Sequence, residues 1–275
     1  DRIHKESHQY VDIVNMFKPI TKWNTSIQNP LITTEVVRKA FKLAEMEKPG
    51  ATHFELPEDV AAMNSDLEPI KPVRLRRAAP DYKAMNGILE RLRFAKRPLI
   101  LAGNGAIRKM ASKHLREFVK RTDIPVVSTF MGKGAISDYD RHSLYAVGLQ
   151  ARDHAMKAID EADLIITVGY DIAEYAPEHW NGNKDNKIIH IDFTPAEVYE
   201  YYQPELEIVC DISAVFWELN IKIKAEEANY DSEWYQPIRQ AITDDLESYK
   251  LKGDDCFTIP GALHIIRDLL DPGDI

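Results

Sequence analysis

The sequence predicts an α/β protein whose main domain is a doubly wound parallel sheet of six strands. Three observations support this fold class. Between residue 81 and about residue 225, short apolar runs alternate with segments of helical periodicity. The runs are apolar at consecutive positions, as expected for parallel strands with helices on both faces. The 275 residues are 44% hydrophobic and 29% charged, which is typical of a globular protein.

The first 80 residues predict one helix, one strand and a connecting segment. Apolar residues recur at helical spacing over 31–47, and Lys48-Pro49-Gly50 ends the run. A short strand pattern follows over 51–57 and is broken by a proline. The stretch 58–80 is polar and contains further prolines, so we expect an interdomain linker there.

The sheet domain follows this linker. Its expected strands are residues 98–103, 124–128, 163–169, 187–192 and 206–210, with a weaker sixth strand at 144–148. Its expected helices are residues 81–93, 109–121, 152–160 and 195–202. Two more helices, 231–250 and 260–270, are too few to form a domain of their own. Crossovers between the strands should be right-handed.

Charge and cysteine usage limit the partners. The net charge of -9 leaves no excess of cations for phosphates, so nucleic acid and anionic membranes are not expected partners. Cys210 and Cys256 have no metal-ligand spacing and form no disulfide framework, which fits a reducing compartment. The chain has no apolar run long enough for a membrane span and no apolar signal region at its start. We therefore expect a cytoplasmic protein.

Both ends of the chain are unusual. It begins on a charged stretch without Met, and it ends at Pro272-Gly273-Asp274-Ile275, directly after an amphipathic segment. We expect that the chain is truncated at both ends.

Gly103 and Gly105 follow the first strand of the predicted sheet. In parallel sheets, ligands bind beyond the carboxyl ends of the strands, where a Gly-x-Gly turn lets the backbone approach a phosphate or a flavin. The third glycine of the dinucleotide fingerprint is missing, and Asp123 does not follow a second strand. A tight structural turn and a phosphate contact both remain open for these glycines.

Lys133, Tyr170 and Asp171 are further candidate cofactor-binding residues. Lys133 follows the second strand without forming a Walker loop. Tyr170 and Asp171 follow the third strand and would place a ring and a carboxylate over the crevice, although the tyrosine could equally pack on a neighbouring domain. The histidines show neither HExxH nor Cys/His clustering, so no metal site is expected.

Several segments resemble acetolactate synthases, which depend on thiamine diphosphate. Residues 1–9 and Phe17-Lys18-Pro19-Ile20-Thr21-Lys22 are similar to the passage that closes the pyrimidine-binding domain of that family. Residues 48–60 resemble a family segment rich in Pro and Gly, with departures at Ala51 and Glu55. Residues 162–181 and 188–192 resemble the catabolic type in particular. The similarity runs over essentially the whole chain.

The resemblance implies three parts. Residues 1–75 would be the tail of the pyrimidine-binding domain plus a linker, 76–225 the central domain, and 226–275 the start of the diphosphate-binding domain. The full enzyme would join two pyruvates into 2-acetolactate with loss of CO₂, using thiamine diphosphate and Mg²⁺. The Gly-Asp-Gly motif that holds this cofactor is absent from the sequence. The resemblance therefore implies a fragment that is inactive alone.

The resemblance also implies roles for single residues. His8 and Gln9 match family residues that line the pocket around the reacting carbon and would be catalytic. Tyr170 to Glu174 stand where flavin-binding relatives carry an Arg-Phe-Asp-Asp-Arg motif, which argues against FAD and makes Gly103 and Gly105 remnants of a flavin cradle. The family forms dimers or tetramers. Two alternatives remain, a stand-alone dinucleotide-binding module and a non-catalytic assembly domain.

Overall fold

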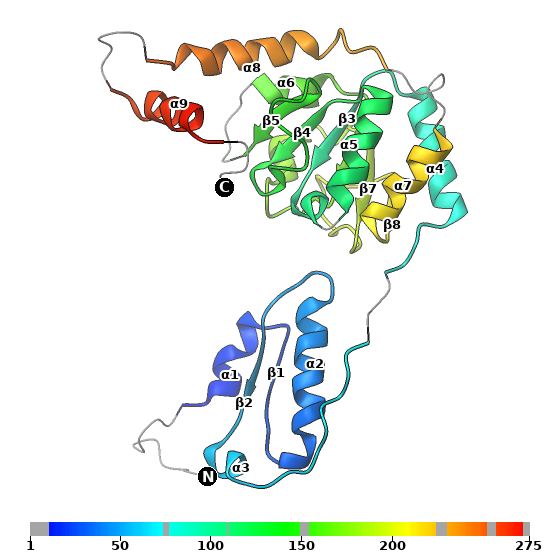
Figure 1. Cartoon of the computed structure of the whole chain (residues 1–275). Helices are drawn as coiled ribbons and strands as arrows, with labels where there is room; N and C mark the ends of the chain where they lie inside the picture. Colours follow the sequence, from blue (N-terminus) through cyan, green and yellow to red (C-terminus); the bar gives the residue numbers. More distant parts are fainter. Residues whose placement is uncertain are drawn as a thin grey trace. The chain divides into compact units, whose positions relative to one another are not determined.

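The computed structural model describes residues 11–73, 77–108, 110–148, 154–223, 230–251 and 257–271. The chain forms two compact units, Asp1–Arg76 and Arg77–Ile275 (Figure 1). The domain limits inferred from the sequence stay a prediction.

The first unit is a small α/β structure. Its elements are α1 (Ile13–Phe17), η1 (Lys18–Ile20), β1 (Trp23–Ser26), η2 (Pro30–Ile32), α2 (Thr33–Glu45), β2 (Thr52–Glu55) and α3 (Glu58–Ala61). Strands β1 and β2 pair in parallel, and α2 buries Val36 and Ala40. The Lys22 ammonium donates to the carbonyls of Met46 and Lys48, both at 2.7 Å, and so fixes the chain that leaves α2.

The second unit contains a six-stranded parallel sheet. Its helices are α4 (Tyr82–Phe94), α5 (Ala111–Thr122), α6 (His154–Glu161), α7 (Ile212–Lys222), α8 (Gln236–Ser248) and α9 (Ile259–Leu269). Its strands are β3 (Pro98–Ala102), β4 (Val126–Thr129), β5 (Ser143–Val147), β6 (Leu164–Val168), β7 (Ile188–Asp192) and β8 (Leu206–Val209). The short turns are η3 (Asn104–Ile107), η4 (Phe130–Gly132) and η5 (Pro177–His179). The strands pair in the order β5-β4-β3-β6-β7-β8.

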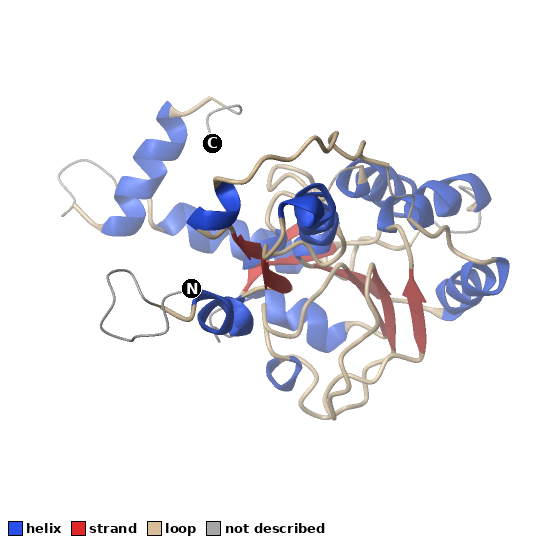
Figure 2. Cartoon of the chain, turned by 90° about the horizontal axis from the view of Figure 1, so that it is seen from below, coloured by secondary structure: helices blue, strands red, loops and turns tan. Residues whose placement is uncertain are grey.

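Helices cover both faces of this sheet (Figure 2). Along β3, Ile100 and Ala102 join the core formed with α4, α5 and α7. The alternating Leu99 and Leu101 join the core formed with α6 and α8. Every residue of β3 is therefore buried, which explains why the run is continuously apolar. The predicted fold class, a doubly wound α/β domain, is confirmed.

Two sequence predictions in this unit were wrong or incomplete. Residues 195–202 do not form the predicted helix: 195–198 have no regular secondary structure, and 199–202 form a turn. The Tyr202 ring enters the core, where its hydroxyl lies 2.6 Å from Thr167 Oγ1 and 2.8 Å from His190 Nδ1. Helix α7 was missed because apolar residues surround its whole circumference, with Val215 buried and Trp217 exposed, so it lacks an amphipathic period.

Candidate functional site

The turns at the carboxyl ends of β3 and β6 form the candidate site, at the position of the ligand-binding crevice in open parallel sheets. From β3 the chain proceeds to β4 and β5 on one side, and it then returns to β6, β7 and β8 on the other. Open parallel sheets bind ligands at the point where the strand order reverses. Ala102 is paired with Val168 and with Ser128. The residues that follow these strand ends therefore lie at one level of the sheet.

Three glycines at this level allow two turns to touch through their backbones. The Gly105 amide donates to the Gly169 carbonyl at 2.8 Å. A Cβ on Gly105 would lie 2.5 Å from Cα of Gly169, and a Cβ on Gly169 would lie 2.3 Å from Cα of Gly105. Gly103 likewise lies against the Gly169 carbonyl, which a Cβ would approach to 2.5 Å. Backbone packing is therefore enough to explain why these positions are glycines.

Glu174 is the polar centre of the crevice. The Asn104 amide donates to its carboxylate at 3.0 Å and 3.2 Å, and the Thr129 hydroxyl donates at 2.5 Å. Burial raises the pKa of Glu174 above its usual value, although the bonds from Thr129 and Asn104 favour the ionised form. Sequence reasoning did not select these three residues. The available signal was an acidic residue in the loop after β6, opposite the Gly-x-Gly turn.

Tyr170 and Asp171 support the loop that carries Glu174. Tyr170 is 2% exposed, its hydroxyl donates to the Tyr175 carbonyl, and it accepts from Trp180 Nε1 at 3.1 Å. Burial raises the pKa of Tyr170. The Asp171 carboxylate accepts from the Ala173 amide at 3.0 Å, which shapes the turn. The structure thus places the Tyr170 ring in the interior of the fold.

The remaining predicted site residues lie elsewhere. The Lys133 ammonium is 3.4 Å from Asp138, and the Lys133 side chain is 65% exposed. No hydrogen bond or ion pair described for this residue links it to Glu174. His8 and Gln9 lie outside the described residues. Their catalytic role stays a prediction.

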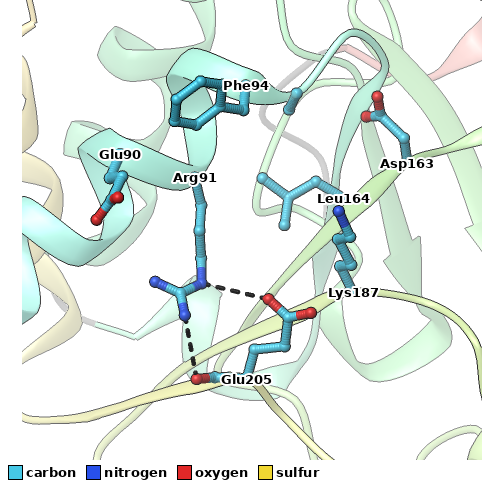
Figure 3. A pocket seen from close by; sticks show the side chains of 8 residues that line it. Glu90, Arg91, Phe94, Asp163, Leu164, Lys187 and Glu205 are labelled. Carbon is cyan, nitrogen blue, oxygen red and sulfur yellow. Dashed lines mark hydrogen bonds and ion pairs between the residues drawn. The ribbon is translucent and has the colours of Figure 1, made fainter.

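A pocket of about 410 Å³ opens at the opposite, amino end of the strands (Figure 3). It is lined by Glu90, Arg91, Phe94, Ala95, Asp163, Leu164, Lys187 and Glu205. Arg91 pairs with the Glu205 carboxylate at 3.5 Å, and Asp163 accepts from the amides of Lys96 and Arg97 at 2.7 Å and 2.9 Å. These bonds connect the end of α4 to β6 and β8 and give the polar side chains of this pocket a structural role.

Two kinds of site are absent from the part of the chain that the structure describes. No group of three His, Cys, Asp or Glu side chains within it is arranged to hold a metal ion. None of the helices within the described ranges combines the length and the apolar character that crossing a membrane requires.

Comparison with known proteins agrees with this architecture. Residues 85–219 match the family model of the thiamine pyrophosphate enzyme central domain. The chain is 31% identical to the acetolactate synthase of Bacillus subtilis (strain 168), over 92% of this chain and 44% of that protein. It is 33% identical to a probable acetolactate synthase large subunit of Methanocaldococcus jannaschii, over 86% of this chain and 41% of that protein. It is 32% identical to the glyoxylate carboligase of Escherichia coli O157:H7, over 78% of this chain and 37% of that protein. The chain spans about two fifths of the length of these relatives.

Proposed function

We propose that the chain is part of an acetolactate synthase, starting from the match of residues 85–219 to the thiamine pyrophosphate enzyme central domain. The complete enzyme would condense two pyruvates to 2-acetolactate with release of CO₂. The similarity over 92% of the chain to an acetolactate synthase carries this proposal, because it extends across both compact units. The chain itself would supply the scaffold and would be inactive alone.

We assign thiamine diphosphate and Mg²⁺ to parts of the complete enzyme outside the described residues. The absence of a Gly-Asp-Gly motif from the sequence supports this assignment. His8 and Gln9 would face the reacting pyruvate, and the complete enzyme would assemble as a dimer or tetramer. The residues from Tyr170 to Glu174 support the catabolic type, which works without FAD, because they lack the arginines of the flavin-binding motif.

The proposal is tested by comparing the complete gene product with the 275-residue chain. Both are incubated with pyruvate, thiamine diphosphate and Mg²⁺, and acetolactate and CO₂ are measured. We expect the complete gene product to form acetolactate and CO₂ and the 275-residue chain to form neither. In the complete protein, His8→Ala should lower kcat/KM for pyruvate. Glyoxylate is the control substrate, because a relative of similar identity is a glyoxylate carboligase. Acetolactate formation by the isolated chain, or turnover of glyoxylate without turnover of pyruvate, would contradict the proposal.

A further inference from the structure

We infer that Glu174 is a built-in occupant of the crevice between β3 and β6, and that it excludes nucleotides from this domain. The position is the one at which a sheet of this topology holds an anionic ligand. Three separate features of the structure support the inference. They are the donors around the carboxylate, the space that it fills and the anchoring of its loop.

The donors that a phosphate would use are already engaged. In parallel sheets, the backbone amides of the turn after the first strand bind phosphate oxygens. Here the Asn104 amide donates to both carboxylate oxygens of Glu174. The Thr129 hydroxyl, at the end of the neighbouring strand β4, donates to Oε2 at 2.5 Å. A carboxylate from the chain itself therefore takes the place of an external anion.

The space over Gly103 is also filled. A glycine at this position normally leaves room for a phosphate to approach the backbone. A Cβ on Gly103 would lie 2.5 Å from the Gly169 carbonyl oxygen, 2.6 Å from Cα of Tyr170 and 2.9 Å from Oε2 of Glu174, so the backbone of the turn after β6 and the carboxylate fill this space together. A phosphate in this space would overlap with the carboxylate and, when Glu174 is ionised, would also be repelled by it.

The loop that carries Glu174 is anchored on both sides. The Glu174 amide donates to the Asp171 carbonyl at 2.9 Å. Tyr170 and Tyr175 are 2% and 4% exposed, and the Tyr170 hydroxyl donates to the Tyr175 carbonyl. Movement of Glu174 out of the crevice would disturb these buried rings. The carboxylate is therefore a fixed part of the domain and does not act as a gate.

The test compares Glu174→Ala with Glu174→Gln. The alanine variant removes the carboxylate from the Asn104 amide and the Thr129 hydroxyl, whereas the glutamine variant removes the charge and keeps the shape. Glu197→Ala is the matched control, because Glu197 is an exposed glutamate after β7. Binding of ADP, FAD and NAD to each form of the 275-residue chain is measured by calorimetry, and the melting temperature is recorded with and without formate.

We expect no saturable nucleotide binding by the wild type, by Glu197→Ala or by Glu174→Gln. Glu174→Ala should melt at a lower temperature, and formate should restore part of the loss, because this small carboxylate can bind the vacated donors. ADP should bind Glu174→Ala at least about tenfold more tightly than the wild type. Saturable binding of ADP, FAD or NAD by the wild type would overturn the inference. An equal rise in the melting temperatures of the wild type and of Glu174→Ala on addition of formate would also overturn it. If Glu174→Ala does not fold, the binding result for the wild type and for Glu174→Gln still decides.

Discussion

Replacing Gly169 with alanine should destabilise the second unit far more than the same change at Gly134. Both glycines have positive φ, +58° at Gly169 and +98° at Gly134. Each alanine would therefore carry a conformational cost of about 1–3 kcal/mol. The two sites differ in their surroundings. A Cβ on Gly169 would lie 2.3 Å from Cα and 2.5 Å from the carbonyl carbon of Gly105, whereas a Cβ on Gly134 would meet nothing within 4 Å.

The difference between the two variants measures the contact between the two turns. Backbone atoms cannot move aside as a flexible side chain can, so β3 and β6 would have to separate at their carboxyl ends. We expect Gly169→Ala to reduce the free energy of unfolding by more than about 4 kcal/mol, and Gly134→Ala by about 1–3 kcal/mol. Urea denaturation followed by circular dichroism gives both values. Losses that agree within about 1 kcal/mol would refute the reasoning, because backbone conformation alone would then explain them.

Three further predictions concern other hydrogen-bonded contacts. Lys22→Met should reduce the free energy of unfolding of the first unit by about 1–3 kcal/mol in urea titrations, because the carbonyls of Met46 and Lys48 lose their charged donor. Tyr202→Phe should reduce that of the second unit by about 1–3 kcal/mol in thermal melts, because Thr167 and His190 lose a buried hydroxyl partner. For Glu174, the folded-state pKa is raised, so the folded protein holds this proton more firmly than the unfolded chain. As the pH falls from the raised pKa toward the ordinary value of 4.5, the free energy of unfolding of the wild type should therefore increase relative to that of Glu174→Gln. Urea titrations at several pH values across this range measure the difference.

Lys22→Met and Tyr202→Phe have matched control variants, and each of the three predictions has a contradicting result. Lys71→Met changes an exposed lysine of the linker and should leave the first unit's stability unchanged. Tyr201→Phe changes the neighbouring tyrosine, whose ring is only partly buried. Equal losses in a variant and its control would refute the proposed contact. A wild-type stability that falls relative to Glu174→Gln on acidification would show that the folded state lowers this pKa.

The sheet could be predicted from the sequence because its strands are buried on both faces. A run such as residues 164–168 is buried throughout and apolar except for Thr167, so the local sequence already contains most of the structural information. Residues 195–202 are different. Their apolar residues have helical spacing, but the tertiary contacts of Tyr202 with partners on β6 and β7 take the place of a helix. Sequence periodicity does not contain such contacts.

The candidate site shows the same limit at the level of single residues. The Gly-x-Gly pattern predicts a close approach to the backbone at Gly103 and Gly105, and the structure places Gly169 there. Cofactor binding by these glycines stays a prediction. The sequence could not specify what approaches, because Glu174 and Gly169 are more than sixty positions away along the chain. Only the register of β3 against β6 brings them to the same level.

A Gly-x-Gly turn commonly provides both a close approach between backbones and a binding site for an anionic ligand. In this domain we infer that only the first of these properties is kept. The glycines keep the close approach between the turns after β3 and β6, which the fold requires whether or not a ligand is bound. The anion that such a turn can hold is supplied by the Glu174 side chain. A domain of this kind retains the doubly wound sheet as a scaffold, because its stability depends on the buried faces of the strands and does not require a nucleotide in the crevice. The identity of the group that faces Asn104 and Thr129 is thus a better guide to ligand binding here than the glycine pattern.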